Sequence, residues 1–284
     1  MIYALITLYN PTDEQINNIN NIMEQVDCVV ACDNSSYSNE YRIPSGCIYS
    51  SSEKNMGLSS AFNYVLKDKK YGWSDSDYII FFDQDSKIRE GHIQNLISDF
   101  ENCLNQKINI GCIGPVYYNT SNDQLEIPHD KTEMLNGIYD VKSIITSSML
   151  CRYKELAAIG FWNDEIFLDM ADWDLCWRFM YNGYKCCMTT NTKITHSVGI
   201  GDKKIGPFHF RVGAPIREYY QIRDSQYLKA KDYTPLKFKI RFFAMRTIRC
   251  MIHEAFYDDS KLRMHYIKRG IKDYKANIHG EYCE

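Results

Sequence analysis

Short apolar runs and longer amphipathic segments alternate along the first hundred residues of the chain. Four of the short runs predict strands, at residues 2–8, 28–32, 47–49 and 78–82. The longer segments predict helices, because their apolar residues recur at helical spacing through residues 16–26, 58–66 and 93–104. Strands that alternate with helices of this length predict an α/β fold, in which a mostly parallel sheet carries helices on both faces.

Local signals mark the ends of some of these elements. Thr12, followed three residues later by Gln15, predicts a capping box at the start of the first helix. Residues 173–180 have helical spacing and are followed by Asn182-Gly183, which predicts the end of a later helix. Residues 193–195 predict a short strand after it.

Polar residues follow the predicted strands at the points where the strands end. Asn10, Asp33, Asp83 and Asp85 would therefore meet at the carboxyl edge of a parallel sheet. Two carboxylates one residue apart offer hard oxygen ligands to a divalent cation, although a solvated turn often has the same sequence. Asp33 also allows two interpretations, because it could accept from a ribose hydroxyl or a pyrimidine imide, or could close an Asx-turn.

Composition and absent motifs narrow the class of protein. The 284 residues are 45% hydrophobic and 24% charged, which fits one α/β domain with a helical appendage. A Gly-x-Gly-x-x-Gly motif does not follow the first strand, which argues against a Rossmann oxidoreductase, and the sequence contains no Gly-x-x-x-x-Gly-Lys-Ser/Thr phosphate loop. Eleven cysteines without metal-binding spacing predict free thiols in a reducing cytosol. No apolar run approaches the length of about 18 residues that a membrane span needs.

The net charge of −3 hides a basic segment near the C-terminus. Residues 234–275 contain eleven Lys or Arg and four acidic residues, so this segment is +7 and the rest of the chain is −10. Its first predicted helix would carry an apolar stripe between basic residues. The stripe comprises Phe238, Phe242, Met245, Ile252 and Phe256, and the basic flanks are Lys237, Arg241, Arg246 and Arg249. Such a helix binds an anionic membrane surface or packs its stripe on the protein, and the sequence does not decide between the two. No nucleic-acid-binding module accompanies it, which argues against nucleic acid as a partner.

Several motifs in a fixed order resemble those of the inverting family 2 glycosyltransferases with the GT-A fold. They are Leu8-Tyr9-Asn10-Pro11, Asp33-Asn34-Ser35-Ser36, the run Asn55-Met56-Gly57-Leu58 through Asn63, Asp83-Gln84-Asp85-Ser86, the acidic run Asp169-Met170-Ala171-Asp172-Trp173-Asp174, and Thr195-His196-Ser197-Val198-Gly199. The Asp-Gln-Asp-Ser form resembles bacterial rhamnosyltransferases in particular. The likeness implies a GT-A catalytic domain over residues 1–212 and a C-terminal helical region over residues 213–284 that could associate with a membrane.

The resemblance also implies a donor site for a nucleotide-diphosphate sugar. The residues it implies as donor contacts are Leu8, Asn10, Asp33, Asn55, Gly57, Leu58 and Asp83. It implies a Mn²⁺ or Mg²⁺ site formed by Asp83, Asp85 and His196, although His196 fits a structural role equally well. A histidine ligand would favour Mn²⁺ over Mg²⁺. Lys203, Lys204 and Arg211 lie in a predicted Gly-rich loop, where they would close over the diphosphate or remain surface charges.

The acidic run near residue 170 implies the chemistry of transfer. Asp172 matches the general base, which takes the proton of the attacking acceptor hydroxyl, and Asp169, Trp173 and Asp174 would contact the acceptor. Asp172 could instead merely cap the helix that follows it, and Asp169 and Asp174 compete for the role of base by proximity. The family often has Glu-Asp where this chain has Ala171-Asp172, so an acceptor contact made by that acid would be missing.

These inferences together predict a metal-dependent inverting glycosyltransferase of bacterial surface-polysaccharide synthesis. It would transfer a sugar, most plausibly rhamnose from dTDP-rhamnose, to a lipid-linked oligosaccharide at the cytosolic face of the membrane, as a peripheral protein. A UDP-linked donor (galactose, galactofuranose or an N-acetylhexosamine) is the alternative within this class. A sugar-nucleotide pyrophosphorylase would need a Gly-rich, Arg-containing loop after the first strand, which Tyr9-Asn10-Pro11-Thr12 does not provide. A non-catalytic carbohydrate-binding protein would be expected to lack the metal motif or the base. The sequence does not fix the oligomeric state, and a homodimer is one alternative.

Overall fold

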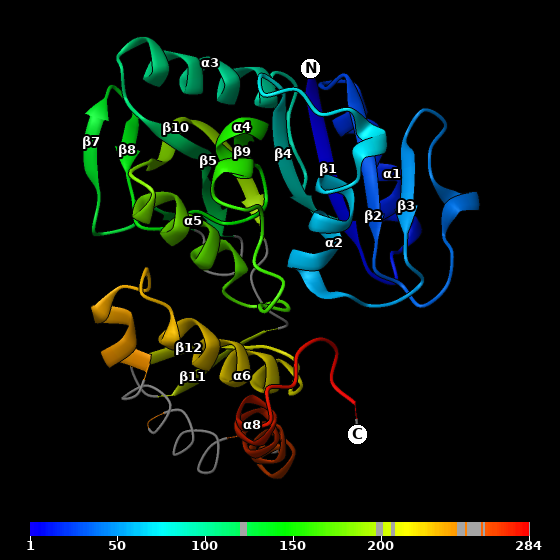
Figure 1. Cartoon of the computed structure of the whole chain (residues 1–284), viewed down its shortest axis with the longest axis vertical. Coiled ribbons are helices and arrows are strands. Elements are labelled where there is room, and N and C mark those ends of the chain that lie inside the picture. The colour runs from blue at the N-terminus through cyan, green and yellow to red at the C-terminus, as the bar shows by residue number, and fades with distance from the viewer. Residues whose placement is uncertain are drawn as a thin grey trace.

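The computed structural model of the chain describes residues 1–119, 124–196, 201–205, 208–242, 248, 257 and 259–283. One mixed sheet organises the larger part of these residues (Figure 1). Its strands are β1 (Ile2–Leu8), β2 (Cys28–Asp33), β3 (Ile48–Ser51), β4 (Tyr78–Asp83), β5 (Ile110–Asn119), β6 (Gln124–Glu126), β7 (Thr132–Leu135), β8 (Ile138–Asp140), β9 (Met149–Arg152) and β10 (Lys185–His196). Along the sheet the strands follow the order β3-β2-β1-β4-β9-β5-β10-β8-β7, and β6 pairs with β5.

Helices connect and cover these strands. They are α1 (Asp13–Met23), α2 (Gly57–Leu66), α3 (His92–Asn105), α4 (Tyr153–Ala158), α5 (Ala171–Tyr181), α6 (Arg217–Ala230) and α8 (Ser260–Lys275), with short 3₁₀ turns at Glu40–Arg42 and Lys69–Tyr71 and a helical stretch at residues 236–242. The capping box predicted at the first helix is present, because the Thr12 side chain accepts from the Gln15 backbone and the Gln15 side chain accepts from the Thr12 backbone.

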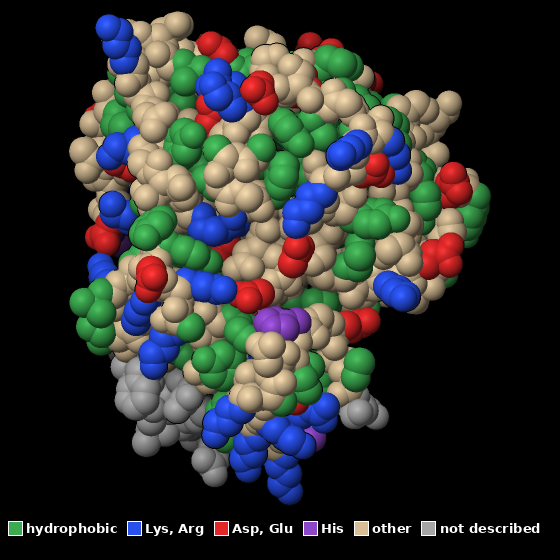
Figure 2. Space-filling view, viewed as in Figure 1, with side chains coloured by type: hydrophobic (Ala, Val, Ile, Leu, Met, Phe, Trp, Pro, Cys, Tyr) green, Lys and Arg blue, Asp and Glu red, His purple; other side chains and the backbone are tan. Residues whose placement is uncertain are grey.

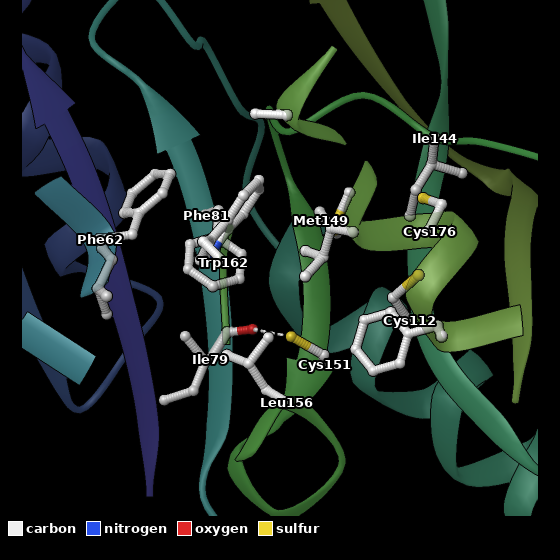
Figure 3. Close-up of a cluster of buried hydrophobic side chains, with 14 of the residues drawn as sticks. Phe62, Ile79, Phe81, Cys112, Ile144, Met149, Cys151, Leu156, Trp162 and Cys176 are labelled. Atoms are coloured by element: carbon white, nitrogen blue, oxygen red, sulfur yellow. Dashed lines mark hydrogen bonds between the residues drawn. The ribbon is translucent and has the colours of Figure 1, made fainter. Parts of the chain in front are cut away.

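Both faces of the parallel half of the sheet are buried, as its continuous apolar strands predict. Alternate residues of β4 illustrate this, because Ile79 and Phe81 face one hydrophobic cluster with α2, α4 and α5, whereas Ile80 and Phe82 face the other with α1 and α3. The aromatic rings of Phe62 and Phe81 lie 4.6 Å apart, which packs α2 against β4 (Figure 3). This contact fixes the start of α2 relative to the end of β4.

The register of the parallel strands brings their carboxyl ends to one level. Leu8 of β1 pairs with Asp33 of β2, and Thr7 of β1 pairs with Asp83 of β4. The polar residues that follow the strands therefore share one edge of the sheet, as predicted. Figure 1 shows α6, α8 and the C-terminal segment lying beyond the edge at which β1 ends.

The C-terminal helices pack against each other and carry buried charges. The guanidinium of Arg223 on α6 is fully buried and donates to Asp224 at 2.8 Å. Basic side chains gather over α8 at one end of the molecule (Figure 2), where Lys268 and Lys272 belong to its sequence. Among the described helices, none combines the length and the apolar character needed to cross a membrane.

Two features differ from the sequence prediction or were missed by it. The sheet contains antiparallel strands that the sequence did not predict. β9 lies between β4 and β5, and β8 and β7 extend the sheet beyond β10. Residues 201–205 (β11) and 208–212 (β12) pair as an antiparallel hairpin, so the predicted Gly-rich loop around Lys203, Lys204 and Arg211 is wrong in its backbone form.

The apolar stripe predicted from residue 238 onward packs on the protein in the part that is described. The Phe238 ring lies 4.8 Å from that of Trp177 on α5, and Phe242 lies 6.1 Å from Phe238. Met245, Ile252 and Phe256, together with Arg246 and Arg249, lie outside the described residues.

Candidate active site

A cavity of about 310 Å³ lies where β1 and β4 end. Its walls come from both ends of the chain, because β1, β4 and α2 supply one side, and α6 and the C-terminal segment supply the other. The lining residues are Thr7, Leu8, Tyr9, Asn34, Asn55, Gly57, Leu58, Asp83, Gln84, Phe167, Leu168, Ile216, Tyr220 and Glu281. Leu8, Asn55, Gly57, Leu58 and Asp83, which were predicted to contact the donor, are thus brought together in one place.

The start of α2 is fitted closely against the loop that precedes α5. Gly57 has a φ of +79°, and a Cβ atom at this position would lie 2.3 Å from the carbonyl oxygen of Phe167. The Leu58 N–H donates to that same oxygen at 2.7 Å, and the Gly57 N–H donates to Asn55 Oδ1 at 3.1 Å. The protein therefore uses these two N–H groups itself.

Asp33 and Asn10 do not line the cavity. The Asp33 side chain is 2% exposed, and its Oδ1 atom accepts from the Ser35 N–H at 2.9 Å, which is the Asx-turn considered from the sequence. Its Oδ2 atom accepts from Asn39 Nδ2 at 2.9 Å and from the Tyr49 hydroxyl at 2.8 Å. Asn10 is exposed and has a left-handed backbone, with a φ of 47°. Donor contacts by these two residues stay predictions.

The loop after β4 is tied to the end of β1. The Tyr9 N–H donates to Gln84 Oε1 at 2.7 Å, and the Asp83 N–H donates to Ser86 Oγ at 3.1 Å. Burial raises the pKa of Asp83 to about 7, and the neighbouring carboxylate of Asp85 contributes to this rise. The positive charge of Arg217 acts in the opposite direction. Asp85 itself is exposed. The loop therefore presents a carboxylate that is costly to keep ionised unless a cation joins it.

Asp172 lies in the first turn of α5, close to this loop. Burial raises the pKa of Asp172 to about 7, and the thiol of Cys176 and the carboxylates of Asp83 and Asp169 raise it further, against a hydrogen bond from the Trp173 N–H at 2.8 Å. A carboxyl group with this pKa can accept a proton near neutral pH. The chain fold thus places a base-like carboxyl beside the Asp-x-Asp loop, although 89 residues separate Asp172 from Asp83.

Arg217, at the start of α6, is a charged residue that the sequence reasoning missed. Its guanidinium pairs with the Asp169 carboxylate, with Nε at 3.2 Å from Oδ2 and a second contact from Nη2 to Oδ1. The hydrogen bond to Asp169 raises the pKa of Arg217, and the charge of Asp83 adds to this rise. No motif in the sequence marked this residue.

Asp174 is buried in the core rather than exposed to the site. Its side chain is 1% exposed, forms an ion pair with Arg178 at 2.8 Å, and accepts from the Tyr233 hydroxyl at 2.6 Å and from Asn163 Nδ2 at 3.1 Å. These contacts contradict the prediction that Asp174 binds the acceptor, because the carboxylate is enclosed and fully engaged. The acidic run therefore divides between a structural residue, Asp174, and two residues near the cavity, Asp169 and Asp172.

Trp173 and His196 complete the predicted set. The Trp173 side chain is 39% exposed beside Asp172, and its ring lies 6.0 Å from that of Trp177. His196 ends β10, where its backbone pairs with Asn119, and its side chain lies outside the described part of the structure. The metal role of His196 stays a prediction.

A search against protein-family models finds no match. The dTDP-rhamnosyl transferase RfbF of Shigella flexneri is 26% identical over 288 residues, a span that covers 95% of this chain and 93% of that protein. Two solved structures share the fold at lower identity. GalNAc-T7 with UDP, GalNAc and Mn²⁺ has a TM-score of 0.59 at 10% identity over 98% of this chain, and S. aureus TarS has a TM-score of 0.56 at 12% identity over 98%.

The chain is a glycosyltransferase with the GT-A fold. Its sequence resembles the rhamnosyltransferases of family 2, as the ordered motifs predicted. This glycosyltransferase spans 57% of the GalNAc-T7 chain and 50% of the TarS chain, so it matches one part of those larger proteins.

One further cluster of reactive side chains lies away from the cavity of this glycosyltransferase. The sulfur atoms of Cys112, Cys176 and Cys186 lie within 4.8 Å of one another, and all three residues are buried. They belong to the hydrophobic cluster that packs α5 on the sheet (Figure 3). Apolar neighbours such as Met149 and Ile144 surround them, which is the packing expected of cysteines used as small apolar side chains.

Proposed function

We propose that this glycosyltransferase moves rhamnose from dTDP-rhamnose to an acceptor hydroxyl, with inversion at the anomeric carbon. The donor part of the proposal is supported by the likeness to RfbF, whose name states that donor class. The observation that carries the chemistry is the position of the Asp172 carboxyl. Burial raises its pKa, and it lies close enough to Asp83 for the charge of that carboxylate to add to the rise. A base and a donor-site acid are therefore adjacent in the fold.

The cavity at the ends of β1 and β4 would hold the nucleoside of the donor. Leu8 and Leu58 line it with apolar surface, and Asn55 adds an amide at its edge. Tyr220 and Phe167 lie on the other wall, and their rings stack with centroids 4.4 Å apart. A slot with apolar walls and polar edges suits a flat base joined to a sugar.

Asp83 and Asp85 would hold a divalent cation at the diphosphate. The fit rests on charge, because the carboxylates of Asp85 and Asp172 both interact with that of Asp83, and burial already makes Asp83 costly to ionise. Mn²⁺ or Mg²⁺ bound there would act as a Lewis acid on the departing nucleoside diphosphate. The related structure of GalNAc-T7 contains Mn²⁺.

Arg217 would add a positive charge on the protein side of the same diphosphate. In the structure its guanidinium is paired with the Asp169 carboxylate and interacts electrostatically with that of Asp83. Phosphate oxygens accept from a guanidinium in the same paired geometry as a carboxylate does. Asp169 would therefore hold Arg217 ready for the donor, rather than contact the acceptor as the sequence suggested.

Asp172 would accept the proton of the acceptor hydroxyl as that oxygen attacks the anomeric carbon. Its pKa of about 7 suits a base that must be ionised before the reaction and protonated after it. The exposed ring of Trp173 beside it offers a flat apolar surface on which an acceptor sugar would stack.

The acceptor is proposed to be an oligosaccharide linked to a lipid, reached from the cytosolic face of a membrane. The described helical stretch at residues 236–242 supports this proposal, because Leu236 and Ile240 lie one turn apart and are 71% and 64% exposed. Lys237 and Arg241 follow them directly in sequence, and Lys237 is 80% exposed. Exposed apolar side chains among basic ones suit an interface with anionic lipid.

A thermal-unfolding screen of nucleotide sugars, with Mn²⁺ or Mg²⁺, tests the donor and the cation together. We expect dTDP-rhamnose with metal to raise the melting temperature, because a ligand of the native state stabilises it by RT ln(1 + [L]/Kd). UDP-galactose, UDP-galactofuranose and UDP-N-acetylhexosamines form the competing arm. Stabilisation by a UDP-sugar alone would reject dTDP-rhamnose as donor while keeping the transferase assignment.

Asp85→Ala tests the cation site, with Asp75→Ala as the matched control. Asp75 is also exposed, but it precedes β4 and therefore lies at the opposite edge of the sheet. Titration calorimetry of dTDP in Mn²⁺ should show lost binding for Asp85→Ala and normal binding for Asp75→Ala. Normal metal-dependent binding by Asp85→Ala would remove Asp85 from the metal site.

A further inference from the structure

We infer that the C-terminal segment, residues 276–283, completes the donor site and that Glu281 accepts a hydrogen bond from the nucleoside of the donor. The inference rests on the proposed use of a nucleotide sugar. Glu281 lines the same cavity as Leu8 and Asp83. Its carboxylate accepts a hydrogen bond from the side chain of Asn55, which precedes it by 226 positions in sequence. The N-terminal and C-terminal parts of the chain therefore meet at this cavity.

The backbone on both sides of Glu281 is held by α6. The carbonyl of Gly280 accepts from Arg223 Nη1 at 2.7 Å, and Arg223 is itself fully buried. On the other side, the Tyr282 N–H donates to the Tyr220 hydroxyl at 3.0 Å. These two bonds fix the position from which the Glu281 side chain reaches the cavity, so it is part of the folded site and not a loose terminal residue.

The Glu281 side chain meets an amide whose orientation is already set. Asn55 Oδ1 accepts from the Gly57 N–H at 3.1 Å, so its Nδ2 group points the other way and donates to Glu281 Oε1 at 3.0 Å. An ionised carboxylate has about four acceptor positions on its two oxygens. Because Glu281 is exposed at the edge of the cavity, it retains acceptor capacity for a ligand.

The chemistry of the cavity selects the kind of group that Glu281 would bind. Asp83 is the other carboxylate among the lining residues, and it lies at the proposed cation site. Asp33, from which the sequence predicted a contact to the base or ribose, is buried outside the cavity with its carboxylate bonded to protein groups. Glu281 is the lining carboxylate outside the proposed cation site, so it would accept from a base N–H or a sugar hydroxyl of the nucleoside.

Titration calorimetry in Mn²⁺ with dTDP, UDP and dUDP tests this inference on the full chain. Glu281→Ala should weaken nucleotide binding by about tenfold or more, because a hydrogen bond to a charged group is lost, and Glu281→Gln should weaken it less. Glu24→Ala is the matched control, since Glu24 is an exposed acid at the far end of α1, and should bind normally. A loss confined to UDP, with dUDP unchanged, identifies the 2′-hydroxyl as the bound group, and an equal loss for all three identifies a group that they share.

Unchanged or tighter binding by Glu281→Ala would overturn the inference, and tighter binding would show that the segment obstructs the cavity instead. The Asp85→Ala variant separates this failure from failure of the proposed function. If Asp85→Ala loses nucleotide while Glu281→Ala keeps it, the cation and donor sites stand and only the role of Glu281 is refuted. If the unaltered chain binds none of the three nucleotides, both proposals fail.

Discussion

Replacing Asp172 with Asn should stop turnover while leaving the donor site in place. The two side chains have nearly the same size, and the Asn Oδ1 atom can keep the hydrogen bond from the Trp173 N–H, which is 2.8 Å long in the structure. What the amide cannot do is accept the proton of the attacking hydroxyl. Donor affinity should change little, because Asp172 is not among the residues that line the cavity.

The expected loss of rate is that of one positioned base. Such a base typically contributes about 10² to 10⁴ in rate, which corresponds to roughly 3 to 5 kcal/mol of transition-state stabilisation. Single-turnover transfer with preformed enzyme–donor complex measures this step directly, and calorimetry with dTDP measures donor affinity. Product release does not limit a single turnover, so the two measurements separate chemistry from binding.

The same substitution should make the metal-free protein more stable. Burial raises the pKa of Asp172 from 3.8 to about 7, so the folded protein binds this proton more tightly than the unfolded chain does. Stability is therefore lost as pH rises from about 4 to 7, and a neutral Asn removes that loss. After allowance for partial exposure, we expect a gain of about 1–2 kcal/mol in the free energy of unfolding at pH 8 with EDTA present.

Asp174→Asn is the contrasting variant in the same motif. Asp174 is paired with Arg178 and enclosed, so its replacement leaves a buried guanidinium short of a partner and should cost about 3 kcal/mol of stability. Its effect on turnover at a temperature where it stays folded should be small. If Asp174→Asn is inactive and Asp172→Asn transfers normally, the assignment of the base is refuted.

Three further predictions follow from other parts of the structure. Gly57→Ala should cost about 2–4 kcal/mol in urea unfolding and weaken dTDP binding, because the added Cβ would lie 2.3 Å from the Phe167 carbonyl oxygen. The free energy of unfolding that the protein loses between pH 7 and pH 5 should be about 2 kcal/mol smaller in His92→Gln. Burial lowers the pKa of His92 to about 4, so only the unfolded chain takes up this proton over that range. Replacing both Leu236 and Ile240 with Ser should lower co-sedimentation with anionic vesicles at least tenfold, because both side chains are exposed apolar groups.

Each of these predictions has a control or an opposing result. Gly72→Ala shares the left-handed backbone, with a φ of +61°, but its Cβ would have no neighbour within 4 Å, so it should cost only about 1 kcal/mol. An unchanged pH slope in the His92 variant would mean that carboxylates alone cause the acid loss of stability. If the unaltered chain does not sediment with vesicles at all, the membrane proposal fails.

The elements that carry the donor cavity could be predicted from the sequence because local patterns determine them. β4 has an unbroken apolar run and a clear polar end at Asp83, and α1 has a complete capping box at Thr12. The short antiparallel strands gave no such signal. β9 has only four residues, and its place between β4 and β5 depends on pairing across the sheet rather than on its own sequence.

The site residues from the C-terminal half could be predicted only in part, for a related reason. The motif points to the acidic run at residues 169–174 but does not show which of its carboxylates is enclosed in the core. Only the buried contacts of Asp174 separate it from Asp172. Arg217 and Glu281 reach the cavity through the packing of α6 and the C-terminal segment, which is a tertiary contact between distant parts of the chain. No periodicity or turn signal in the sequence encodes such a contact.

The buried cysteines allow transient opening of the protein to be measured by thiol labelling. Cys112, Cys151 and Cys176 lie in one layer beside the sheet and Cys103 and Cys187 lie in the other, and all are 0% exposed. A thiol reagent reaches them only in molecules that have transiently opened, so the labelling rate reports the population of the open state in each layer separately. Cys283, which is exposed, reacts at once and provides the internal reference. A donor that closes the two ends of the chain around itself would slow both layers together, and an effector that loosens one layer would be seen in that layer alone.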